Sequence, residues 1–419
     1  MYRFLSILSL ALFLTACSSN GSIGEVNVVQ TPCNIGGESN LFKSQSGNLY
    51  LSWIEYENDT VSILKYAKWE DDTWSVAREI ARGANWFVNW ADFPAMAVSG
   101  ANDMHMAAHW LEKSAAGTFD YDVVLSQSYD GGQSWSAGEV VHKDSVHAEH
   151  GFVSIQGVSD GSFSMCWLDG RNTKMEGHEH EDDHGHDHGH GHHGSMSLRY
   201  TKVLADGTID PSVELDNKVC DCCQTDMVIN DLGTLVVYRD RSDQEVRDIY
   251  IKRLVDGQWE TPKAVFNDNW EIAACPVNGP AIAAEGNNVI VFWYTMDEEG
   301  PVLRYAWSDD FGSTFSKATD LMVENPIGRV DAKFVNSDQV LLTWMEAADN
   351  KEAVIMGGLV PFGEDLLEGQ VIVRTGNNRN SGFPRIEVLD KKAYMTWTNT
   401  SVSEKEFIES ASFDLSFVD

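Results

Sequence analysis

The sequence predicts an all-β protein that folds as a seven-bladed β-propeller, and a repeated strand pattern is the main reason. A run of β-branched and aromatic residues such as 288–294 fits a half-buried strand. Similar runs recur and end at Trp53, Trp110, Trp167, Tyr238, Trp293, Trp344 and Trp397. These aromatic residues are 51 to 57 residues apart, except for one step of 71 residues. A period of about 50 residues that holds four strands is typical of a propeller blade.

The last repeat predicts how the ring closes. It supplies only three strands, over residues 383–389, 393–398 and 407–413, whereas residues 25–31 are strand-like and belong to no repeat. We therefore expect residues 25–31 to form the outer strand of the last blade, because this pairing removes two exposed sheet edges. The alternative is a six-bladed propeller of the sialidase type in which one repeat is misread.

Two turns between the third and fourth strands of a blade share the motif S-x-D-x-G-x-x-W/F. Ser and Asp side chains can bond the turn backbone, Gly permits positive φ, and the aromatic residue packs on the neighbouring hairpin. The motif residues are Ser128, Asp130, Gly132, Trp135, Ser308, Asp310, Gly312 and Phe315. Here the sequence resembles the sialidase-like propellers, whose hallmark is this Asp box. The resemblance implies the fold more than the function.

The N-terminus resembles a bacterial lipoprotein signal. Arg3 precedes a short apolar run, residues 4–14, and small residues stand directly before Cys17. The run is too short to span a membrane, so we expect residues 1–16 to be removed and Cys17 to carry lipid, palmitate included. Residues 17–24 then form a tether and 25–419 the propeller, anchored in the cell envelope at the outer membrane, facing the periplasm or the exterior. An ordinary secretory signal is the alternative.

The charge balance excludes one class of partner. The chain has 64 acidic residues against 30 Lys and Arg, a net charge of -34. Such a protein repels phosphate, so nucleic acid is not expected as a partner. We expect a monomer whose partners are the membrane, through the lipid, and a metal ion or glycan.

Propeller topology places the unusual residues on one face. The links between blades and the loops between second and third strands share one end of the ring, here named the top face, and convergent loops of this kind form binding sites. The ionisable candidates on these segments are Asp92, Asp169, Arg171, Asp240, Arg241, Arg329 and Glu346. The aromatic residues Trp86, Trp90 and Trp270 serve either as stacking platforms of a noncatalytic glycan or protein adaptor or as packing between blades.

Three cysteines in four residues, Cys220, Cys222 and Cys223, form the most informative cluster. Cys is usually disulfide-bonded in exported proteins, but adjacent Cα atoms lie about 3.8 Å apart, too close for the usual disulfide. One cysteine of the cluster can bridge to Cys275, in the next link, or the thiols can bind a soft metal such as Cu(I). His147 and His150, in the preceding link, are candidates to complete the coordination. Cys166 is expected in the core.

A His-rich insertion explains the long step between repeats. Residues 177–193 alternate imidazoles with Gly and carboxylates, a composition that suits Zn, Cu or Ni but forms no core. The eight imidazoles are those of His178, His180, His184, His186, His188, His190, His192 and His193. The tract is either a metal collector for the ligands nearby or a solvated spacer.

The resemblance also implies a competing function. Sialidases hydrolyse terminal sialic acids with three arginines that clamp the substrate carboxylate, a Tyr–Glu nucleophile pair and an Asp acid. Their first arginine belongs to an F/Y-R-I-P motif; residues 38–43 of the first repeat contain no arginine, and residues 383–386 have similar letters in another order. Arg171, Arg241 and Arg329 are the candidates for such a clamp. A glycosidase that uses two of the top-face carboxylates is a related alternative.

Overall fold

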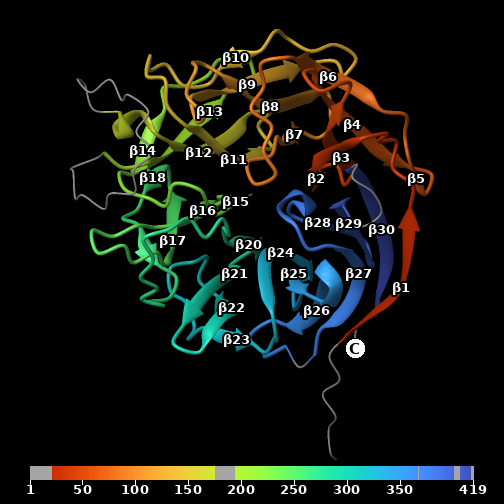
Figure 1. The fold of residues 1–419 in the computed structure, drawn as a ribbon, viewed down its shortest axis with the longest axis vertical. Helices are drawn as coiled ribbons and strands as arrows, with labels where there is room; N and C mark the ends of the chain where they lie inside the picture. The colour runs from red at the N-terminus through yellow and green to blue at the C-terminus, as the bar shows by residue number, and fades with distance from the viewer. Residues whose placement is uncertain (1–20, 175–193, 367, 401–405, 417–419) are drawn as a thin grey trace, which may run out of the picture.

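The computed structural model describes residues 21–174, 194–366, 368–400 and 406–416 and shows seven antiparallel sheets arranged as a ring (Figure 1). Each sheet is one blade, and its first strand lies nearest the axis. The first three blades contain β2 (Gly36–Lys43), β3 (Leu49–Tyr56), β4 (Ser62–Glu70), β5 (Thr73–Trp74) and β6 (Arg78–Gly83); β7 (Met96–Ser99), β8 (His105–Lys113), β9 (Tyr121–Ser128) and β10 (Glu139–Val140); and β11 (His150–Gly157), β12 (Phe163–Asp169), β13 (Ser197–Val203) and β14 (Val213–Asp216).

Blades 4 to 7 repeat this arrangement. They contain β15 (Asp226–Asn230), β16 (Gly233–Arg239), β17 (Ile249–Val255), β18 (Gln258–Trp259) and β19 (Lys263–Ala264); β20 (Ala281–Glu285), β21 (Asn288–Asp297), β22 (Gly300–Ser308) and β23 (Thr319–Leu321); β24 (Pro326–Asn336), β25 (Gln339–Ala347), β26 (Glu352–Pro361) and β27 (Gln370–Gly376); and β28 (Arg385–Leu389), β29 (Lys392–Asn399), β30 (Phe407–Ser416) and β1 (Ser22–Val29). The helical elements of the described chain are three short 3-10 turns, η1 (Arg171–Thr173), η2 (Asp349–Lys351) and η3 (Arg379–Ser381). Among the described residues, no helix has the length and apolar character needed to cross a bilayer.

The N-terminal strand closes the ring, as predicted. The sheet order is β1-β30-β29-β28, and β1 pairs antiparallel with β30 from Ser22↔Ser416 to Val29↔Ser410. The strand starts earlier than the expected residues 25–31, because pairing with β30 already begins at Ser22 and passes a bulge before Val26. Thr31 has left the strand, and its hydroxyl donates to the Ile408 carbonyl at 2.6 Å. The blade count is seven, so the six-bladed alternative is wrong.

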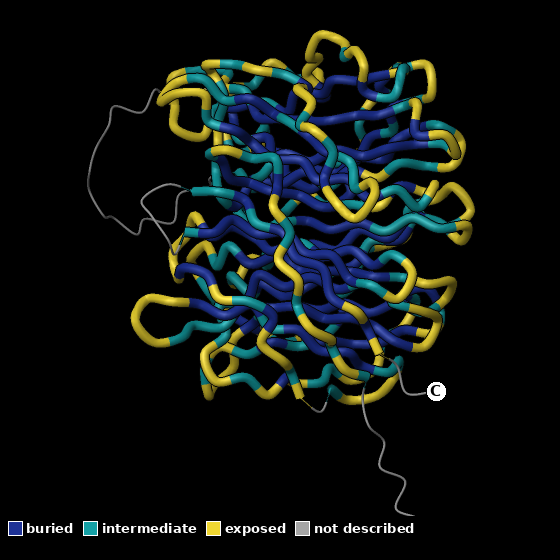
Figure 2. The backbone as a smooth tube through the Cα atoms, turned by 90° about the vertical axis from the view of Figure 1, so that its right-hand side faces the viewer, coloured by how far each residue is buried: buried dark blue, intermediate teal, exposed yellow. Residues whose placement is uncertain are grey.

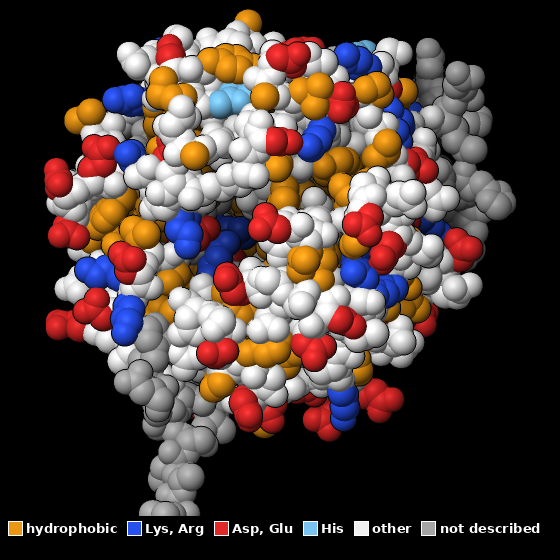
Figure 3. All heavy atoms as spheres, turned by 180° about the vertical axis from the view of Figure 1, so that it is seen from behind, with side chains coloured by type: hydrophobic (Ala, Val, Ile, Leu, Met, Phe, Trp, Pro, Cys, Tyr) orange, Lys and Arg blue, Asp and Glu red, His pale blue; other side chains and the backbone are white. Residues whose placement is uncertain are grey.

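A cavity lies at the centre of the ring. It has a volume of about 520 Å³ and is lined by the innermost strands, with Lys43, Lys333 and Arg385 as its cationic residues. Seen from behind, the ring is hollowed at its centre, where Lys and Arg side chains gather (Figure 3). Phe93 and Phe383, from two links, also line the cavity, and Trp90 and Phe93 pack on Phe383 with ring centroids 5.9 Å apart in each pair. In a side view, the strands are mostly buried and the loops at their ends are mostly exposed (Figure 2).

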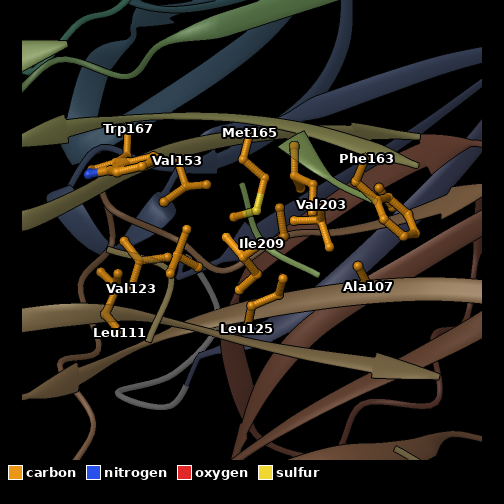
Figure 4. Close-up of a cluster of buried hydrophobic side chains, with 14 of the residues drawn as sticks. Ala107, Leu111, Val123, Leu125, Val153, Phe163, Met165, Trp167, Val203 and Ile209 are labelled. Atoms are coloured by element: carbon orange, nitrogen blue, oxygen red, sulfur yellow. The ribbon is translucent and has the colours of Figure 1, made fainter. Parts of the chain in front are cut away.

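The core lies between neighbouring blades. The repeated residues Trp53, Trp167, Trp293 and Trp397 are at most 1% exposed, so the period seen in the sequence is a period of buried aromatic residues. Between blades 2 and 3, Trp167 and Met165 of β12 face apolar residues of β8 and β9 (Figure 4). Cys166 is fully buried, as expected of a core residue.

The two S-x-D-x-G-x-x-W/F turns fold alike at the end of the blades opposite the top face. In the first, Gly132 N–H donates to the Ser128 hydroxyl at 2.9 Å and Ser134 N–H to Asp130 Oδ1 at 2.9 Å. In the second, Gly312 N–H donates to the Ser308 hydroxyl at 2.9 Å and Thr314 N–H to Asp310 Oδ1 at 2.7 Å. The side chains therefore satisfy the turn backbone, as the motif predicts.

Bulges reshape the innermost strands at the top face. β2, β11 and β24 each shift register near their start. At these points Glu38, Phe152 and Arg329 have φ of 54°, 53° and 52°. A bulge of this kind redirects a side chain at the rim of a sheet, and so the positions where it occurs decide which groups face the top surface.

Candidate thiolate site on the top face

Four cysteines from two links meet above blade 4. Cys220, Cys222 and Cys223 lie between β14 and β15, and one sulfur from each lies within 4.8 Å of the other two. The Sγ atoms of Cys220 and Cys223 are 3.5 Å apart. Cys275, between β19 and β20, lies close enough to Cys222 for the two thiols to shift each other's pKa. These four are free thiols in the structure, and the prediction that at least two of them approach one another is confirmed.

Arginines support a negative charge on one sulfur. Hydrogen bonds from Cys222 and Cys223, and then the positive charges of Arg247 and Arg239, hold the pKa of Cys220 well below its ordinary value despite burial. Arg247 Nη1 lies 3.2 Å from Cys220 Sγ, and Glu245 fixes the guanidinium from its other side at 2.8 Å. Burial raises the pKa of Cys223 to about 12. Cys220 is therefore the sulfur of this cluster at which a negative charge is favoured.

This donor set fits a thiophilic metal. A metal ion about 2.3 Å from each of several tetrahedrally placed sulfurs separates those sulfurs by about 3.8 Å. The sulfurs of Cys220 and Cys223 are already at 3.5 Å, and that of Cys222 is within 4.8 Å of both. Thiolates select Cu(I) and Zn over hard cations. Arg247 was not predicted as part of the site; the structure pairs it with Glu245 beside Cys220.

The histidine candidates do not join the sulfurs. His147 is exposed, and His150 is fully buried among carboxylates of blades 2 and 3. The proposed completion of the thiolate site by these two residues is therefore wrong, because the start of β11 turns His150 toward Asp144 and Asp169. Cys17 and the His-rich residues from His178 to His193 lie outside the described part of the chain.

Two carboxyl groups of the top face, those of Asp92 and Glu149, contact the same tyrosine hydroxyl, that of Tyr121. Tyr121 Oη is 3.0 Å from Asp92 Oδ2 and 2.9 Å from Glu149 Oε1. One hydroxyl donates one proton, so both contacts are hydrogen bonds only when a carboxyl is protonated. Burial raises the pKa of Asp92 to about 7, and burial with the charges of Asp92, Asp221 and Cys275 raises that of Glu149 to about 8.

Replacing Glu149 by Gln is expected to remove part of the pH dependence of stability. The pKa of Glu149 is about 8 in the folded protein against an ordinary 4.5. Stability from its protonated form is complete below the unfolded pKa and is lost as pH rises through 8. Thermal melts should therefore show equal melting temperatures at pH 4 and a more stable Glu149→Gln variant at pH 9. Glu139→Gln, at an exposed site, is the matched control and should follow the parent at both pH values.

The three arginines expected of a sialidase clamp are engaged separately. Arg171 pairs with Asp169 at 2.6 Å, and Arg241 pairs with Asp221 at 3.0 Å. Arg329 is buried; its Nη1 donates to the Gly382 carbonyl at 2.8 Å, and its guanidinium lies 5.0 Å from the Trp90 ring centre. Their partners differ, so these arginines do not converge on one ligand.

The remaining candidates have structural partners. Glu346 Oε1 accepts the Trp344 indole N–H at 2.7 Å. Burial raises the pKa of Asp240, a partly exposed residue, to about 7. Trp270 is buried beneath Arg239, and Trp86 stacks on Trp110 with centroids 5.3 Å apart. For the tryptophans, packing between blades is thus the better interpretation.

The fold and site define a seven-bladed β-propeller that carries a cluster of cysteines on its top face. No family model matches the sequence, and no curated protein matches it. Among solved structures, the polysaccharide lyase Uly1 has 10% identity and a TM-score of 0.54, covering 92% of this chain and 91% of its own.

Two further structures are similar over the length of the propeller. A protein of unknown function from Dyadobacter fermentans has 13% identity and a TM-score of 0.50, covering 94% of this chain and 99% of its own. The NanB sialidase of Streptococcus pneumoniae has 10% identity and a TM-score of 0.47, covering 95% of this chain and 71% of its own. Similarity at such identities concerns the fold alone.

Proposed function

We propose that this protein is a lipid-anchored envelope protein that binds a soft or borderline transition metal, Cu(I) or Zn²⁺, through Cys220, Cys222, Cys223 and Cys275. The observation that carries the proposal is the convergence of these cysteines, with the Sγ atoms of Cys220 and Cys223 at 3.5 Å. Two arginines beside Cys220 offset the negative charge that a metal–thiolate centre accumulates. The links that carry the cysteines, β14–β15 and β19–β20, are both attached to blade 4. The sulfurs are therefore held in place before a metal ion binds, which lowers the entropy cost of binding.

The His-rich tract and the N-terminus supply the remaining parts of this role. The tract, residues 177–193, is inserted between β12 and β13, in a loop of the same face as the thiols. Its imidazoles collect metal weakly, and the thiolates retain it. Lipid on Cys17 anchors the chain, and the propeller begins with β1 at Ser22, inside the stretch 17–24 that the sequence assigned to the tether.

Removing residues 177–193 is expected to leave tight metal binding intact. β12 and β13 pair from Phe163↔Val203 to Asp169↔Ser197, and a change in loop length alters closure entropy only slowly. Reduced parent and variant are titrated anaerobically with Cu(I) against a chromophoric chelator. Both should retain one tightly bound ion per chain and melt alike without metal, while the parent binds additional weaker ions. If the deletion abolishes tight binding, the tract is the site and the proposal is wrong.

A glycan is the second candidate ligand, favoured by the axial cavity. Its volume of about 520 Å³ lies within the range of small-molecule sites, and its polar lining includes Lys333, Arg385 and Glu387. Incubation with fluorogenic glycosides and a glycan array distinguishes hydrolysis from binding. No turnover and no retained glycan would leave metal binding as the function.

A further inference from the structure

A second group of metal-binding side chains lies at the top of the seam between blades 2 and 3, apart from the thiols. Four chain segments contribute to it: the start of β9, the link after β10, the start of β11 and the end of β12. The side chains form two overlapping groups of three, Asp122–His142–His150 and Asp144–His150–Asp169. Within each group, one nitrogen or oxygen atom of every residue lies within 4.8 Å of such an atom in the other two. We name this group the Asp–His cluster, and its residues are Asp122, His142, Asp144, His150 and Asp169.

Hydrogen bonds fix the proton on one nitrogen of each imidazole. His150 Nδ1 is 3.1 Å from the carbonyl oxygens of both Tyr121 and Ala148, which only accept, so Nδ1 carries the proton. His142 Nδ1 lies 2.9 Å from Asp144 Oδ2 and donates to it in the same way. In both neutral rings the Nε2 lone pair is therefore free to bind a cation.

Both Nε2 atoms are buried and lack a hydrogen-bond partner among the described residues. His142 is 4% exposed and His150 is 0% exposed. The two stacked rings point their Nε2 atoms to opposite ends of the cluster: Asp144 Oδ1 and Asp169 Oδ1 lie 3.6 Å and 3.7 Å from His150 Nε2, and Asp122 Oδ1 lies 3.5 Å from His142 Nε2. The lone pair of His150 Nε2, which faces two carboxylates in a buried site, is satisfied by a proton or by a metal ion between them.

The spacing favours a metal ion. Ligand atoms about 2.1 Å from a tetrahedral Zn²⁺ are separated by about 3.4 Å, and the observed nitrogen–oxygen distances are close to this value. Protonation of both rings is disfavoured, because their centroids are 3.7 Å apart with planes within 12° and stacked imidazoliums repel. An Nδ1–H bonded to a carbonyl or carboxylate is also the usual support of a metal-ligating histidine.

The net charge of the Asp–His cluster also favours a bound cation. Asp122, Asp144 and Asp169 contribute three negative charges, and among the residues that the structure describes the one cationic side chain bonded to them is that of Arg171, at 2.6 Å from Asp169 and 2.9 Å from Asp144. With neutral imidazoles the group has two excess negative charges in a largely buried site. We propose that the Asp–His cluster is a second cation site, independent of the thiolates, for a divalent ion of borderline hardness such as Mn²⁺ or Zn²⁺.

Mn²⁺ is the probe that separates this site from the proposed thiolate centre, because imidazole and carboxylate suit it whereas thiolates prefer softer ions. The chain without residues 177–193 is titrated with Mn²⁺ and free Mn²⁺ is measured by electron paramagnetic resonance. One ion per chain should bind and be displaced by Zn²⁺. His150→Gln and Asp144→Asn should each weaken binding by about 100-fold, whereas Asp160→Asn, at a surface ion pair with Lys202, should not.

Imidazole ¹⁵N spectra keep the inference testable if a cluster variant fails to fold. Addition of Zn²⁺ to the parent should shift Nε2 of His150 and leave its Nδ1 protonated. Absence of Mn²⁺ binding, unchanged affinity in His150→Gln, or an Nε2 that stays protonated with Zn²⁺ present would each reduce the cluster to an ion-pair network. None of these results bears on Cu(I) binding by the cysteines.

Discussion

Serine in place of both Cys222 and Cys223 is expected to lower the affinity for Cu(I) by at least about 1000-fold. The sulfurs of Cys222 and Cys223 lie within 4.8 Å of each other and of Cys220, so the double substitution removes two of the three clustered ligands. A hydroxyl is a hard and weak ligand for Cu(I). The measurement is competition with a chromophoric chelator, together with the near-ultraviolet thiolate-to-copper absorption, which should disappear.

A matched control separates a local effect from damage to the fold. Cys33→Ser removes a partly exposed free thiol of another link and should bind Cu(I) like the parent. Because Cys223 is 2% exposed, the double variant is also checked by circular dichroism. Should it unfold, Cys275→Ser, at an exposed position, must still reduce affinity by about 10-fold. Parent-like affinity in a folded double variant contradicts the proposed thiolate site.

A chain that begins at Pro32 is expected to lose most of its stability. The deletion removes β1 and its antiparallel ladder with β30, and with them Ile23 and Val26, which cover the core shared by blades 6 and 7. Lost apolar burial and about six hydrogen bonds together amount to roughly 5–10 kcal/mol. That loss is comparable with the whole stability of a typical domain. Urea unfolding followed by tryptophan fluorescence measures it.

The control for this deletion is a chain that begins at Gly21 and keeps β1. It should unfold at the same urea concentration as the longer chain. A synthetic peptide of residues 21–31 should restore part of the stability of the shortened chain by adding a strand to the open edge of β30. Equal stability of the chains that begin at Gly21 and at Pro32 would show that β1 contributes little to the ring.

The fold was predictable because each blade buries an aromatic residue at the same position, and these residues recur at a regular spacing in the sequence. Trp293 and its counterparts occupy the same position in successive sheets, and a fully buried aromatic residue leaves a periodic signal in the sequence. Closure by the N-terminus followed from counting strands. The start of β1 did not, because Ser22 is polar and its place is set by pairing with β30.

The candidate sites were predictable only where their residues are clustered in the sequence. Cys220, Cys222 and Cys223 are neighbours along the chain, and topology brings Cys275 to them. The Asp–His cluster was missed because its members are isolated polar residues in the sequence, and the seam between blades brings His142 of blade 2 against His150 of blade 3. Arg329 was misjudged, since a position on the top face does not fix side-chain direction, and the bulge at φ 52° buries this one.

Closure by β1 makes completion of the chain a kinetic requirement for folding. The hydroxyls of Ser22 and Ser416 are in hydrogen-bond contact across 394 residues. During synthesis, β1 therefore has no partner until β30 has been made. Contacts so distant in sequence form slowly. A prematurely terminated chain that lacks β30 retains β1 without its partner and β29 as an open edge, which other chains and proteases can recognise. Only full-length molecules can hide both edges.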